Sequence, residues 1–364
     1  MGGTGRPHKS PPVPGTLDEV TAGWLDAALA EGGVVAAAVA TVDVAPLGPA
    51  VGLLGDLARL RVSYRTGHGP PSMIVKVPTA NPGGHRVGSM LGAWAREVAF
   101  YREVAPASPG ADVPRCYHAA ADPDRGRWVV VLEDVPSDPV DGAAGATEEQ
   151  AMAAVEALAR FHATWWNDPR RFAWMPGFDR AGGVGGLQGS WLEAIPVFLE
   201  RFGHVVPAPT GAWLRAFAPT LGRWSARSAT EPLTIVHADY RLDNLLVADG
   251  RVTMIDWQTA LRGPGAMDLT SFVATSLTVE ARRRSEDGLI ARYLEVLASR
   301  GIVVDEAWFA RSYDENLLWW MGQFANNLAR LEPETDAIRR SLDTMIERTY
   351  TAALDRDVGR LIER

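Results

Sequence analysis

The stretch IVHADYRLDNLLVADGRVTMIDWQ, residues 235–258, decides how the rest of the chain is interpreted. It sets Asp239, Asn244 and Asp256 between short apolar runs and turns. The Asp-Gly pair at 249–250 favours a tight hairpin turn that joins NLLVA to RVTMI. The run VTMI has the length and β-branched content of a buried strand. The stretch therefore predicts a loop, a strand, a tight turn and a second strand, with all three polar side chains at one end of the hairpin.

Three polar groups of this kind suit phosphoryl transfer. In that reaction one carboxylate receives or orients the attacking hydroxyl, while an Asn and a second carboxylate hold Mg²⁺ on the phosphates. The pattern H-x-D-x-x-x-x-N, followed by an apolar strand that ends in Asp, is the protein-kinase-like catalytic arrangement. The alternative is a surface hairpin with capping Asp and Asn residues, because these residue types favour turns. The Ile-Asp-Trp sequence at the expected distance after the loop favours catalysis.

The composition is that of a globular protein with room for two lobes. Of the 364 residues, 47% are hydrophobic and 22% are charged. The formal net charge of −8 argues against a general nucleic-acid binder, which would carry a basic face. No apolar run reaches the roughly 18 residues that a membrane span needs, so we expect no membrane partner. The single Cys116 excludes an internal disulfide framework and a multi-cysteine metal site, and it fits a reducing cytoplasm.

The lobe boundaries follow from local composition. Residues 1–15 are rich in Gly and Pro and predict a disordered tail, without the apolar region of a secretory signal. Residues 16–135 predict an N-terminal lobe that begins with a helix capped by Thr16 and continues mainly as strands. Residues 136–146 have the composition of a linker, so residues 136–364 predict a second, helical lobe.

Two charged residues of the N-terminal lobe are candidates for a phosphate-binding pair. Lys76 lies inside the strand MIVKVP, and Glu97 lies on the helix that GSMLGAWAREVAFYREV predicts. A kinase-like fold pairs a strand Lys with a Glu on the following helix. The alternatives are a solvent-facing Lys and a solvated helix face. Glycines at 48–55 could cover phosphates, but their spacing does not match G-x-G-x-x-G, so a plain hairpin is the simpler interpretation.

The segment WVVVLEDV predicts a buried strand with a polar exit, as in an adenine-binding hinge. Backbone groups from Glu133 to Val135 could pair with the base there. The alternative is a central strand that ends in acidic residues.

Several features of the C-terminal half carry open alternatives. Thr147 predicts the start of a helix through a capping box with Gln150. His162 is a lone His on an apolar stripe and favours a structural role. Asp268 either caps a helix or braces the catalytic loop. The pair at 319–320, two Trp residues on one predicted helix, either fills the core or walls an acceptor pocket.

The remaining connections are predicted from composition. Residues 167–190 are rich in Pro and Gly and predict a long loop that belongs to a substrate cleft. From residue 279 to residue 364 the chain is predicted to be helical, with breaks near 300–304 and 332–334.

In order, the chain presents a strand Lys, a helix Glu, a strand running into LED, a helix with LARFHATWW, and then HADYRLDN and IDWQ. This combination resembles the aminoglycoside phosphotransferase-like kinases. The segments PPSMIVKVP, REVAFYREVAP, VPRCYHA, VVVLEDV and IDWQTALRGPGAMDL are similar to those of the ecdysteroid kinase-like branch. The resemblance covers the chain from about residue 47 to about residue 277, and the C-terminal helices match only in general character.

The resemblance implies an α+β, bilobal protein-kinase-like fold that binds ATP and Mg²⁺ and transfers the γ-phosphoryl group to a small-molecule hydroxyl. It assigns Asp239 as the catalytic base or orienting group, and Asn244 and Asp256 as Mg²⁺ ligands. It assigns Lys76 and Glu97 to the ATP phosphates. One departure is Ala238, which stands where the family usually has Gly between His and Asp. Alanine lacks glycine's freedom at positive φ, so the loop would shift slightly without losing a reacting group.

We expect a cytoplasmic small-molecule kinase that acts on a hydroxylated antibiotic and confers resistance by inactivating it. The Ala-, Gly- and Arg-rich composition supports this because it suggests a high-GC bacterial source. A metabolic kinase of a sterol, sugar or choline-like alcohol is the alternative with the same active site. A nucleotide-binding pseudokinase that acts through partners is the alternative from another class. A protein kinase is disfavoured, because Ile-Asp-Trp stands where Asp-Phe-Gly would be expected.

Overall fold

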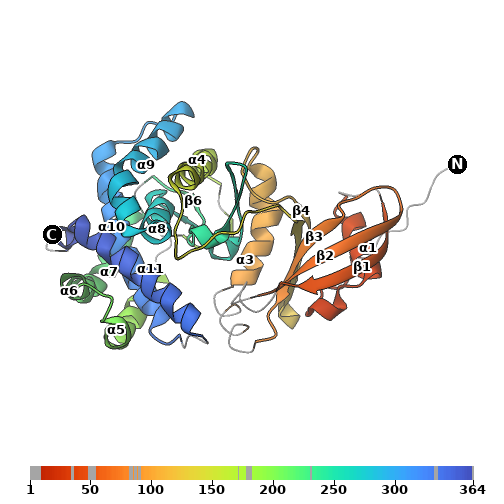
Figure 1. Ribbon diagram of the computed structural model, residues 1–364, viewed down its shortest axis with the longest axis horizontal. Coiled ribbons are helices and arrows are strands. Elements are labelled where there is room, and N and C mark those ends of the chain that lie inside the picture. The colour runs from red at the N-terminus through yellow and green to blue at the C-terminus, as the bar shows by residue number, and fades with distance from the viewer. Residues whose placement is uncertain are drawn as a thin grey trace. The chain divides into compact units, whose positions relative to one another are not determined.

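The computed structural model describes residues 10–33, 37–47, 55–81, 85, 88, 92–170, 172–177, 183–229, 232–331 and 335–362. The chain forms two compact units. The sheet unit comprises Met1–Pro109, Val113–Pro136 and Ile255–Thr259, and the helical unit comprises Gly110–Asp112, Ser137–Met254 and Ala260–Arg364. In Figure 1 the sheet belongs to the red-to-yellow part of the chain, and most of the long helices to the green-to-blue part.

The sheet unit contains a five-stranded antiparallel sheet in the order β1-β2-β3-β5-β4. Its strands are β1 (Ala38–Pro46), β2 (Gly55–Thr66), β3 (Ser72–Pro78), β4 (Cys116–Asp122) and β5 (Arg127–Glu133). The predicted strands of the N-terminal lobe are thereby confirmed. Because β3 is the middle strand, Lys76 is flanked by Leu57 of β2 and Val130 of β5. The glycine turn proposed at 48–55 lies outside the described residues except for Gly55.

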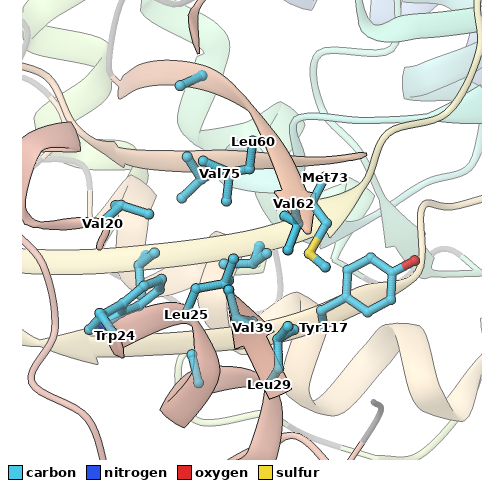
Figure 2. Close-up of a cluster of buried hydrophobic side chains, with 14 of the residues drawn as sticks. Val20, Trp24, Leu25, Leu29, Val39, Leu60, Val62, Met73, Val75 and Tyr117 are labelled. Carbon is cyan, nitrogen blue, oxygen red and sulfur yellow. The ribbon is translucent and has the colours of Figure 1, made fainter. Parts of the chain in front are cut away.

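One face of the sheet is covered by α1 (Ala22–Glu31). Trp24, Leu25 and Leu29 of this helix are buried against apolar side chains of the sheet, as Figure 2 shows. The labelled partners in that view are Val39, Leu60, Val62, Met73, Val75 and Tyr117. Burial of these side chains supplies the driving force for the helix to dock on the sheet.

The helix predicted to start at Thr16 starts later, so that prediction is wrong. Thr16 precedes only a short 3₁₀ turn (Leu17–Glu19) and makes no capping hydrogen bond with its side chain. Thr21 caps the helix instead, and its Oγ1 accepts a hydrogen bond from Trp24 N over 3.2 Å. Two Thr residues compete for this role, and the one next to the buried Trp24 is the cap, because packing of the helix fixes where it begins.

Part of the N-terminal segment that its composition predicts to be disordered is held against the sheet unit. The main-chain carbonyl of Pro12 accepts a hydrogen bond from Trp24 Nε1 over 2.8 Å. The carbonyl of Val13 accepts one from Arg127 Nη1 over 3.3 Å. Residues 1–9 lie outside the described residues.

The helix of the sheet unit that carries Glu97 is α3 (Ala93–Ala99), which continues as a π-helical turn (Phe100–Val104). Residues 255–259 return to this unit from far along the chain. Their anchor is Trp257, whose buried ring stacks on Phe100 with a centroid distance of 4.0 Å and an interplanar angle of 7°. This contact holds the residues after Asp256 against the end of the helix.

The helical unit consists mainly of eight described α-helices. They are α4 (Glu148–Trp165), α5 (Gly183–Phe202), α6 (Ala208–Phe217), α7 (Leu221–Ser228), α8 (Ala266–Ser276), α9 (Val279–Ser299), α10 (Glu306–Leu328) and α11 (Asp336–Asp355). Two short antiparallel pairs complete the unit, β6 (Thr234–Val236) with β9 (Leu261–Gly263) and β7 (Leu245–Ala248) with β8 (Arg251–Met254). The hairpin predicted around the Asp-Gly pair at 249–250 and the helix break near 300–304 are confirmed. The break predicted near 332–334 lies outside the described residues.

For the helical unit, the predicted capping box at Thr147 is confirmed and the predicted loop at 167–190 is partly wrong. The capping box of α4 is present, because Thr147 Oγ1 accepts from Gln150 N over 3.2 Å and Gln150 Oε1 accepts from Thr147 N over 2.9 Å. The long loop predicted for 167–190 is wrong in its last part, since α5 already begins at Gly183. The glycines there have low helix propensity, but the fully buried Trp191 packs the helix into the core and overrides it.

The core of the helical unit centres on α8 and α10. Trp319 of α10 stacks on Trp224 with a centroid distance of 4.9 Å, and Trp320 Nε1 donates to the Met267 carbonyl over 2.9 Å. Both Trp side chains are buried, which favours the core interpretation over an acceptor-pocket wall. Among the described residues, no helix is both long and apolar enough to cross a membrane.

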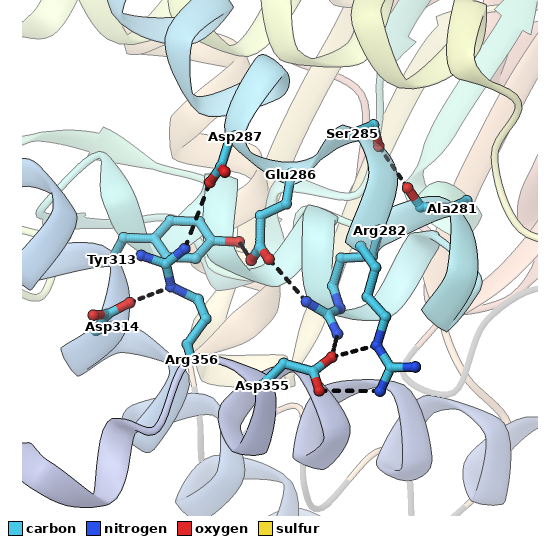
Figure 3. Close-up of polar contacts among 10 residues, drawn as sticks. Ala281, Arg282, Ser285, Glu286, Asp287, Tyr313, Asp314, Asp355 and Arg356 are labelled. Atoms are coloured by element: carbon cyan, nitrogen blue, oxygen red, sulfur yellow. Dashed lines mark hydrogen bonds and ion pairs between the residues drawn. The ribbon is translucent and has the colours of Figure 1, made fainter.

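A network of charged side chains joins α9, α10 and the end of α11 (Figure 3). The buried Arg282 pairs with Glu286 over 2.8 Å and with Asp355. Asp355 also accepts from Arg283 over 2.7 Å and 3.0 Å. Tyr313 OH donates to Glu286 over 2.8 Å. Each buried charge in this network has an opposite charge beside it, so removal of one partner would leave a buried charge uncompensated.

Candidate active site

Lys76, Glu97 and Asp256 come together in the sheet unit. Lys76 Nζ donates to Glu97 Oε2 over 2.8 Å and to Asp256 Oδ1 over 2.6 Å. The side chains of Lys76 and Glu97 are 8% and 1% exposed, whereas that of Asp256 is 27% exposed. Neither a solvent-facing Lys76 nor a solvated face around Glu97 fits this burial, so both of those alternatives are wrong.

The backbone at Asp256 is strained. Its φ of +66° lies in the left-handed region, which costs a residue with a side chain about 1 kcal/mol or more. Two contacts hold the side chain in place. Oδ1 accepts from Lys76, and Oδ2 accepts from Gln258 Nε2 over 3.1 Å. Strain that is held in this way is typical of functional positions.

The charges of this cluster shift the pKa values of Lys76 and Glu97. Burial by itself would lower the pKa of Lys76, but the carboxylates of Asp256 and Glu97 together raise it above its ordinary value. Burial, reinforced by Asp256, raises the pKa of Glu97 to about 7, against the opposing effect of Lys76. The ammonium is therefore charged at neutral pH and is positioned by two acidic groups, as a phosphate-binding Lys requires.

The Lys76 side chain is closely packed on the side that faces Gly55 and Trp128. Its Nζ lies 5.8 Å from the ring centroid of the buried Trp128, a cation–π distance. At Gly55 a Cβ would lie 3.1 Å from Lys76 Cε, from Trp128 and from the main-chain oxygen of Val77. Glycine is therefore the residue that fits beside the Lys76 side chain.

The proposed hinge residues follow β5. Glu133 N donates to the Arg115 carbonyl over 2.8 Å, and Glu133 Oε2 accepts from Arg115 N over 3.2 Å. Between Glu133 and Val135, the carboxylate of Asp134 accepts from Arg59 Nε over 2.7 Å. These contacts fix the conformation of the segment. Pairing of Glu133 and Val135 with an adenine base stays a prediction.

Asp239 and Asn244 come together in the helical unit. Asn244 Nδ2 donates to the main-chain oxygen of Asp239 over 2.8 Å and to its Oδ2 over 2.9 Å. Arg241 Nε lies 3.2 Å from Asp239 Oδ1. The Asp239 side chain remains 32% exposed, so a hydroxyl group from solvent can reach it. The carboxylate is held in one orientation, which a general base or orienting group needs.

The backbone of this loop is strained immediately before Asp239. Ala238 has a φ of +59°, in the left-handed region that glycine adopts more easily. Two hydrogen bonds to the buried Asp268 hold it there. His237 N donates to Asp268 Oδ2 over 2.6 Å, and Ala238 N donates to Oδ1 over 2.8 Å. Asp268 therefore braces the loop that leads into Asp239. It is not the N-cap of α8, which is Gly265.

A buried chain of polar groups extends from Asp268 to α9. His162 Nε2 lies 3.2 Å from Asp268 Oδ2, and His162 Nδ1 lies 2.7 Å from Tyr293 OH. Burial raises the pKa of Tyr293, so its hydroxyl stays protonated and can donate to Nδ1. A Cβ at Gly265 would lie 2.4 Å from the Tyr293 oxygen, so only glycine fits at the start of α8. His162 thus has the structural role that the sequence favoured.

The predicted metal ligands offer oxygen atoms of the type that Mg²⁺ prefers. Asn244 provides a carboxamide oxygen and Asp256 a carboxylate. The nitrogen of the Asn244 carboxamide is used by Asp239, so its oxygen is the atom available to a cation. Within the described ranges no group of three or more His, Cys, Asp and Glu side chains could hold a metal. Each of these two side chains, taken by itself, offers an oxygen donor that fits Mg²⁺ bound largely through phosphate and water oxygens.

Comparison with known families agrees with this chemistry. The model of the phosphotransferase enzyme family (APH) matches residues 53–303, which is well over half of the chain. This chain belongs to that family. It is therefore a phosphotransferase, of a family that acts on small-molecule substrates.

Solved structures place the enzyme in the kinase-like fold. It resembles choline kinase from Cryptosporidium parvum Iowa II, with a TM-score of 0.53 and 11% identity over 88% of this chain and 90% of that one. It also resembles the ADP-bound aminoglycoside phosphotransferase APH(2'')-Ib, with a TM-score of 0.50 and 12% identity over 84% of this chain and 94% of that one. At these identities the likeness establishes the fold.

One curated relative matches over a short stretch. The N-acetylmuramate/N-acetylglucosamine kinase of Neisseria meningitidis serogroup B is 34% identical over 94 residues, which are 25% of this chain and 26% of that protein. The chain thus spans about a quarter of the length of this relative.

The structure adds four residues to the site of the enzyme that sequence analysis did not assign to it. Arg241 and Gln258 contact the carboxylates of Asp239 and Asp256, and each lies two positions after the Asp that it contacts. This spacing of two residues is the sequence pattern from which these contacts could have been predicted. Tyr293 and Gly265 complete the buried chain beneath the loop. No local pattern indicates Tyr293, because it comes from a distant part of the sequence, and the need for glycine at 265 becomes apparent only from the Tyr293 oxygen beside it.

Proposed function

We propose that this phosphotransferase transfers the γ-phosphoryl group of ATP to a hydroxyl of a small molecule, with Asp239 as the catalytic residue. The observation that carries the proposal is the fixed, partly exposed Asp239 carboxylate, held between Asn244 and Arg241. The Lys76–Glu97–Asp256 cluster supports the same chemistry, because it presents a charged ammonium that two carboxylates position for a phosphate group.

In the proposed reaction, Asp239 accepts the proton of the acceptor hydroxyl as the hydroxyl oxygen forms its bond to the γ-phosphorus. The bond from this phosphorus to the β–γ bridging oxygen breaks, and ADP leaves with the electron pair of that bond. Lys76, kept in place by Glu97, binds the phosphate oxygens of the nucleotide. Asn244 and Asp256 would hold Mg²⁺, which neutralises phosphate charge when it is bound. Backbone groups between Glu133 and Val135 would pair with the adenine base.

A hydroxylated antibiotic, inactivated by phosphorylation, is the first candidate acceptor. A metabolic alcohol such as a sterol, a sugar or a choline-like compound is the second. The similar proteins are named for choline, for aminoglycosides and for N-acetylated amino sugars, which supports a small hydroxylated acceptor in general. A pseudokinase that only binds nucleotide is disfavoured, because binding alone does not require an oriented Asp239. Placement in the cytoplasm rests on the single cysteine and stays a prediction.

The test is Mg·ATP-dependent phosphorylation of a panel of hydroxylated antibiotics, sugars and sterols, with product mass as the readout. The control is Asp239→Ala. A phosphorylated product that requires Asp239 establishes the reaction and its acceptor. Binding of Mg·ATP without any transfer, together with equal behaviour of Asp239→Ala, would favour the pseudokinase.

A further inference from the structure

A cluster of polar side chains joins the segment after β5 to two other strands of the sheet. The carboxylate of Asp134 accepts two hydrogen bonds from Arg59 of β2, from Nε to Oδ2 over 2.7 Å and from Nη2 to Oδ1 over 3.1 Å. Ser72, the first residue of β3, donates its hydroxyl to the same Oδ2. We call these three residues the Asp134 cluster. Three parts of the sheet unit thus meet at one carboxylate.

The Asp134 side chain is held in a single orientation. A guanidinium that binds both oxygens of a carboxylate fixes the direction of that carboxylate as well as its position. The side chain of Asp134 is 16% exposed and that of Arg59 is 44% exposed. Burial alone would raise the pKa of Asp134, but Arg59 and Ser72 together lower it below its ordinary value. The carboxylate is therefore charged at neutral pH, and the ion pair is formed.

The main chain at Asp134 lies just beyond the paired part of the sheet. β5 ends at Glu133, and Met73 of β3 is the partner of Glu133 across the ladder. One step further, this register places Asp134 opposite Ser72, where the contact is made by side chains. The Asp134 carboxylate therefore supplies the anchor that ladder hydrogen bonds supply to residues inside a strand.

The Asp134 cluster lies on the same face of the sheet as Lys76. Side chains alternate along a strand, so Ser72, Ile74 and Lys76 of β3 share one face. Arg59 is the cross-strand partner of Ile74 and therefore lies on that face too. Four residues separate Ser72 from Lys76, which is about 13 Å along a strand. One face of the sheet thus carries the phosphate-binding Lys76 near one end of β3 and the Asp134 cluster at the other.

The position of Asp134 in the chain connects the cluster with nucleotide binding. Asp134 stands between Glu133 and Val135, the residues whose main-chain groups are proposed to pair with adenine. Hydrogen bonds weaken steeply when their angles depart from the preferred range, so the direction of these main-chain groups decides how well they bind a base. A segment that is fixed before binding also loses little conformational entropy when the ligand enters.

Stability alone is a weak explanation for the cluster. Ion pairs that are open to solvent contribute little to folding, and Arg59 is nearly half exposed. β2 carries a second ion pair of this exposed kind, in which Arg61 Nη1 lies 3.3 Å from Asp43 Oδ2. That pair joins β2 to β1 and has no link to the segment after β5. It is therefore a natural comparison for the Asp134 cluster.

We propose that Asp134 is a positioning residue for the adenine base. Arg59 and Ser72 hold its side chain, and through it they fix the main chain from Glu133 to Val135 in the conformation that binds the base. Asp134 acts through this main chain. The inference rests on the proposed ATP-dependent phosphotransfer and adds to it the residues that prepare the sheet unit for the nucleotide.

The test measures the affinity of the full chain for Mg·ATP and for adenosine by calorimetric titration. Adenosine carries the base without the phosphates, so it reports on the base alone. We expect Asp134→Asn and Arg59→Met each to raise both dissociation constants about fivefold or more. Unchanged affinity for adenosine in both variants would overturn the inference, whatever happens to Mg·ATP. A wild-type chain that binds neither compound would instead contradict the proposed function, and the inference with it.

The matched control is Arg61→Met. Arg61 lies two residues from Arg59 on the same face of β2, and we expect its replacement to change the affinity for adenosine less than about twofold. Arg59→Met also keeps the test valid if Asp134→Asn does not fold, because the Arg59 side chain is partly exposed. An effect of Arg59→Met on adenosine affinity no larger than that of Arg61→Met would overturn the positioning role.

A double variant separates positioning from a general loss of stability. Arg59 and Asp134 act as one unit in this account, so Arg59→Met combined with Asp134→Asn is expected to bind adenosine about as well as either single variant. Affinity losses that multiply in the double variant would contradict this coupling. A purely structural ion pair would lower the urea midpoint of both single variants and leave their adenosine affinity at the wild-type value.

Discussion

Replacing Asp268 by Asn tests how the strained catalytic loop is held. The substitution keeps the size of a fully buried side chain and changes one carboxylate oxygen into an NH₂ group. In the native protein both oxygens accept, from His237 N over 2.6 Å and from Ala238 N over 2.8 Å. In the variant, one main-chain N–H faces another donor, whichever way the carboxamide is turned.

The expected cost follows from these contacts. A hydrogen bond to a charged group contributes about 1.5–3 kcal/mol, and a buried donor without an acceptor adds a desolvation cost of about 1–3 kcal/mol. Relaxation of Ala238 out of its left-handed conformation returns about 1 kcal/mol. We therefore expect Asp268→Asn to lower the free energy of unfolding by about 2–4 kcal/mol. We also expect phosphotransfer activity to fall, because Asp239 directly follows the released backbone.

Urea unfolding monitored by tryptophan fluorescence measures the loss, and hydrogen exchange at the His237 and Ala238 amides locates it. A double-mutant cycle with Ala238→Gly then separates the contribution of the Asp268 hydrogen bonds from the cost of the left-handed conformation at Ala238. In the native background glycine relieves the positive φ, so its effect is expected to lie between zero and a gain of about 1 kcal/mol. In the Asp268→Asn background the strain is already released, so glycine is expected to destabilise by about 0.4–1 kcal/mol.

Two results would refute this reasoning. One is a loss of stability below about 1 kcal/mol for Asp268→Asn, which would mean that the two hydrogen bonds do not hold the loop. The other is an effect of Ala238→Gly that is the same in both backgrounds, which would show that Asp268 and the strained residue are uncoupled.

Three further changes test the other parts of the site and the fold. Lys76→Met should raise the KM of ATP about 10–100-fold, because it removes a charged hydrogen-bond donor that contributes about 1.5–3 kcal/mol. Steady-state kinetics measures this change, and an unchanged KM of ATP would contradict the prediction. Gly55→Ala should weaken nucleotide binding severalfold, because the added methyl group lies 3.1 Å from Lys76 Cε. Calorimetric titration with Mg·ATP measures the affinity, and an affinity equal to that of the wild type would contradict the prediction. Asp355→Asn should destabilise the protein by about 2–3 kcal/mol at pH 7, because Arg282 is left buried with one partner fewer. The Arg283 and Arg282 guanidinium groups lower the pKa of Asp355 below its ordinary 3.8, so its contribution is present above that pH and is lost as the pH falls through the lowered value. Urea unfolding from pH 7 to pH 2 should therefore show the wild type and Asp355→Asn converging at acid pH, and a constant difference would be inconsistent with the ion pair.

The sequence predicted the elements of the fold where local patterns are strong. The strand around Lys76, the capping box at Thr147 and the hairpin at 249–250 each depend on neighbouring residues, and each is present. The predictions failed where distant packing decides between similar local signals. Thr16 and Thr21 are equally good caps by residue type, and the buried Trp24 selects the second.

Contacts within the site were predictable only in part. The sequence allowed a Lys76–Glu97 pair, but burial of Glu97 depends on how α3 packs beside the stacked Phe100 and Trp257. Whether Asp268 caps α8 or braces the loop depends on a helix start that differs by three residues, from Gly265 to Asp268. Such a shift is smaller than local sequence preferences can resolve.

The most direct test of the central claim is the rate of phosphoryl transfer by Asp239→Asn in a single turnover, with [γ-³²P]ATP and a saturating acceptor. The Asn side chain keeps the shape and the contact to Asn244 but accepts a proton poorly. We predict that the transfer rate falls about 10²–10⁴-fold while the dissociation constant of Mg·ATP stays within about threefold. Transfer at the wild-type rate would contradict the assignment of Asp239 as the group that receives the acceptor proton.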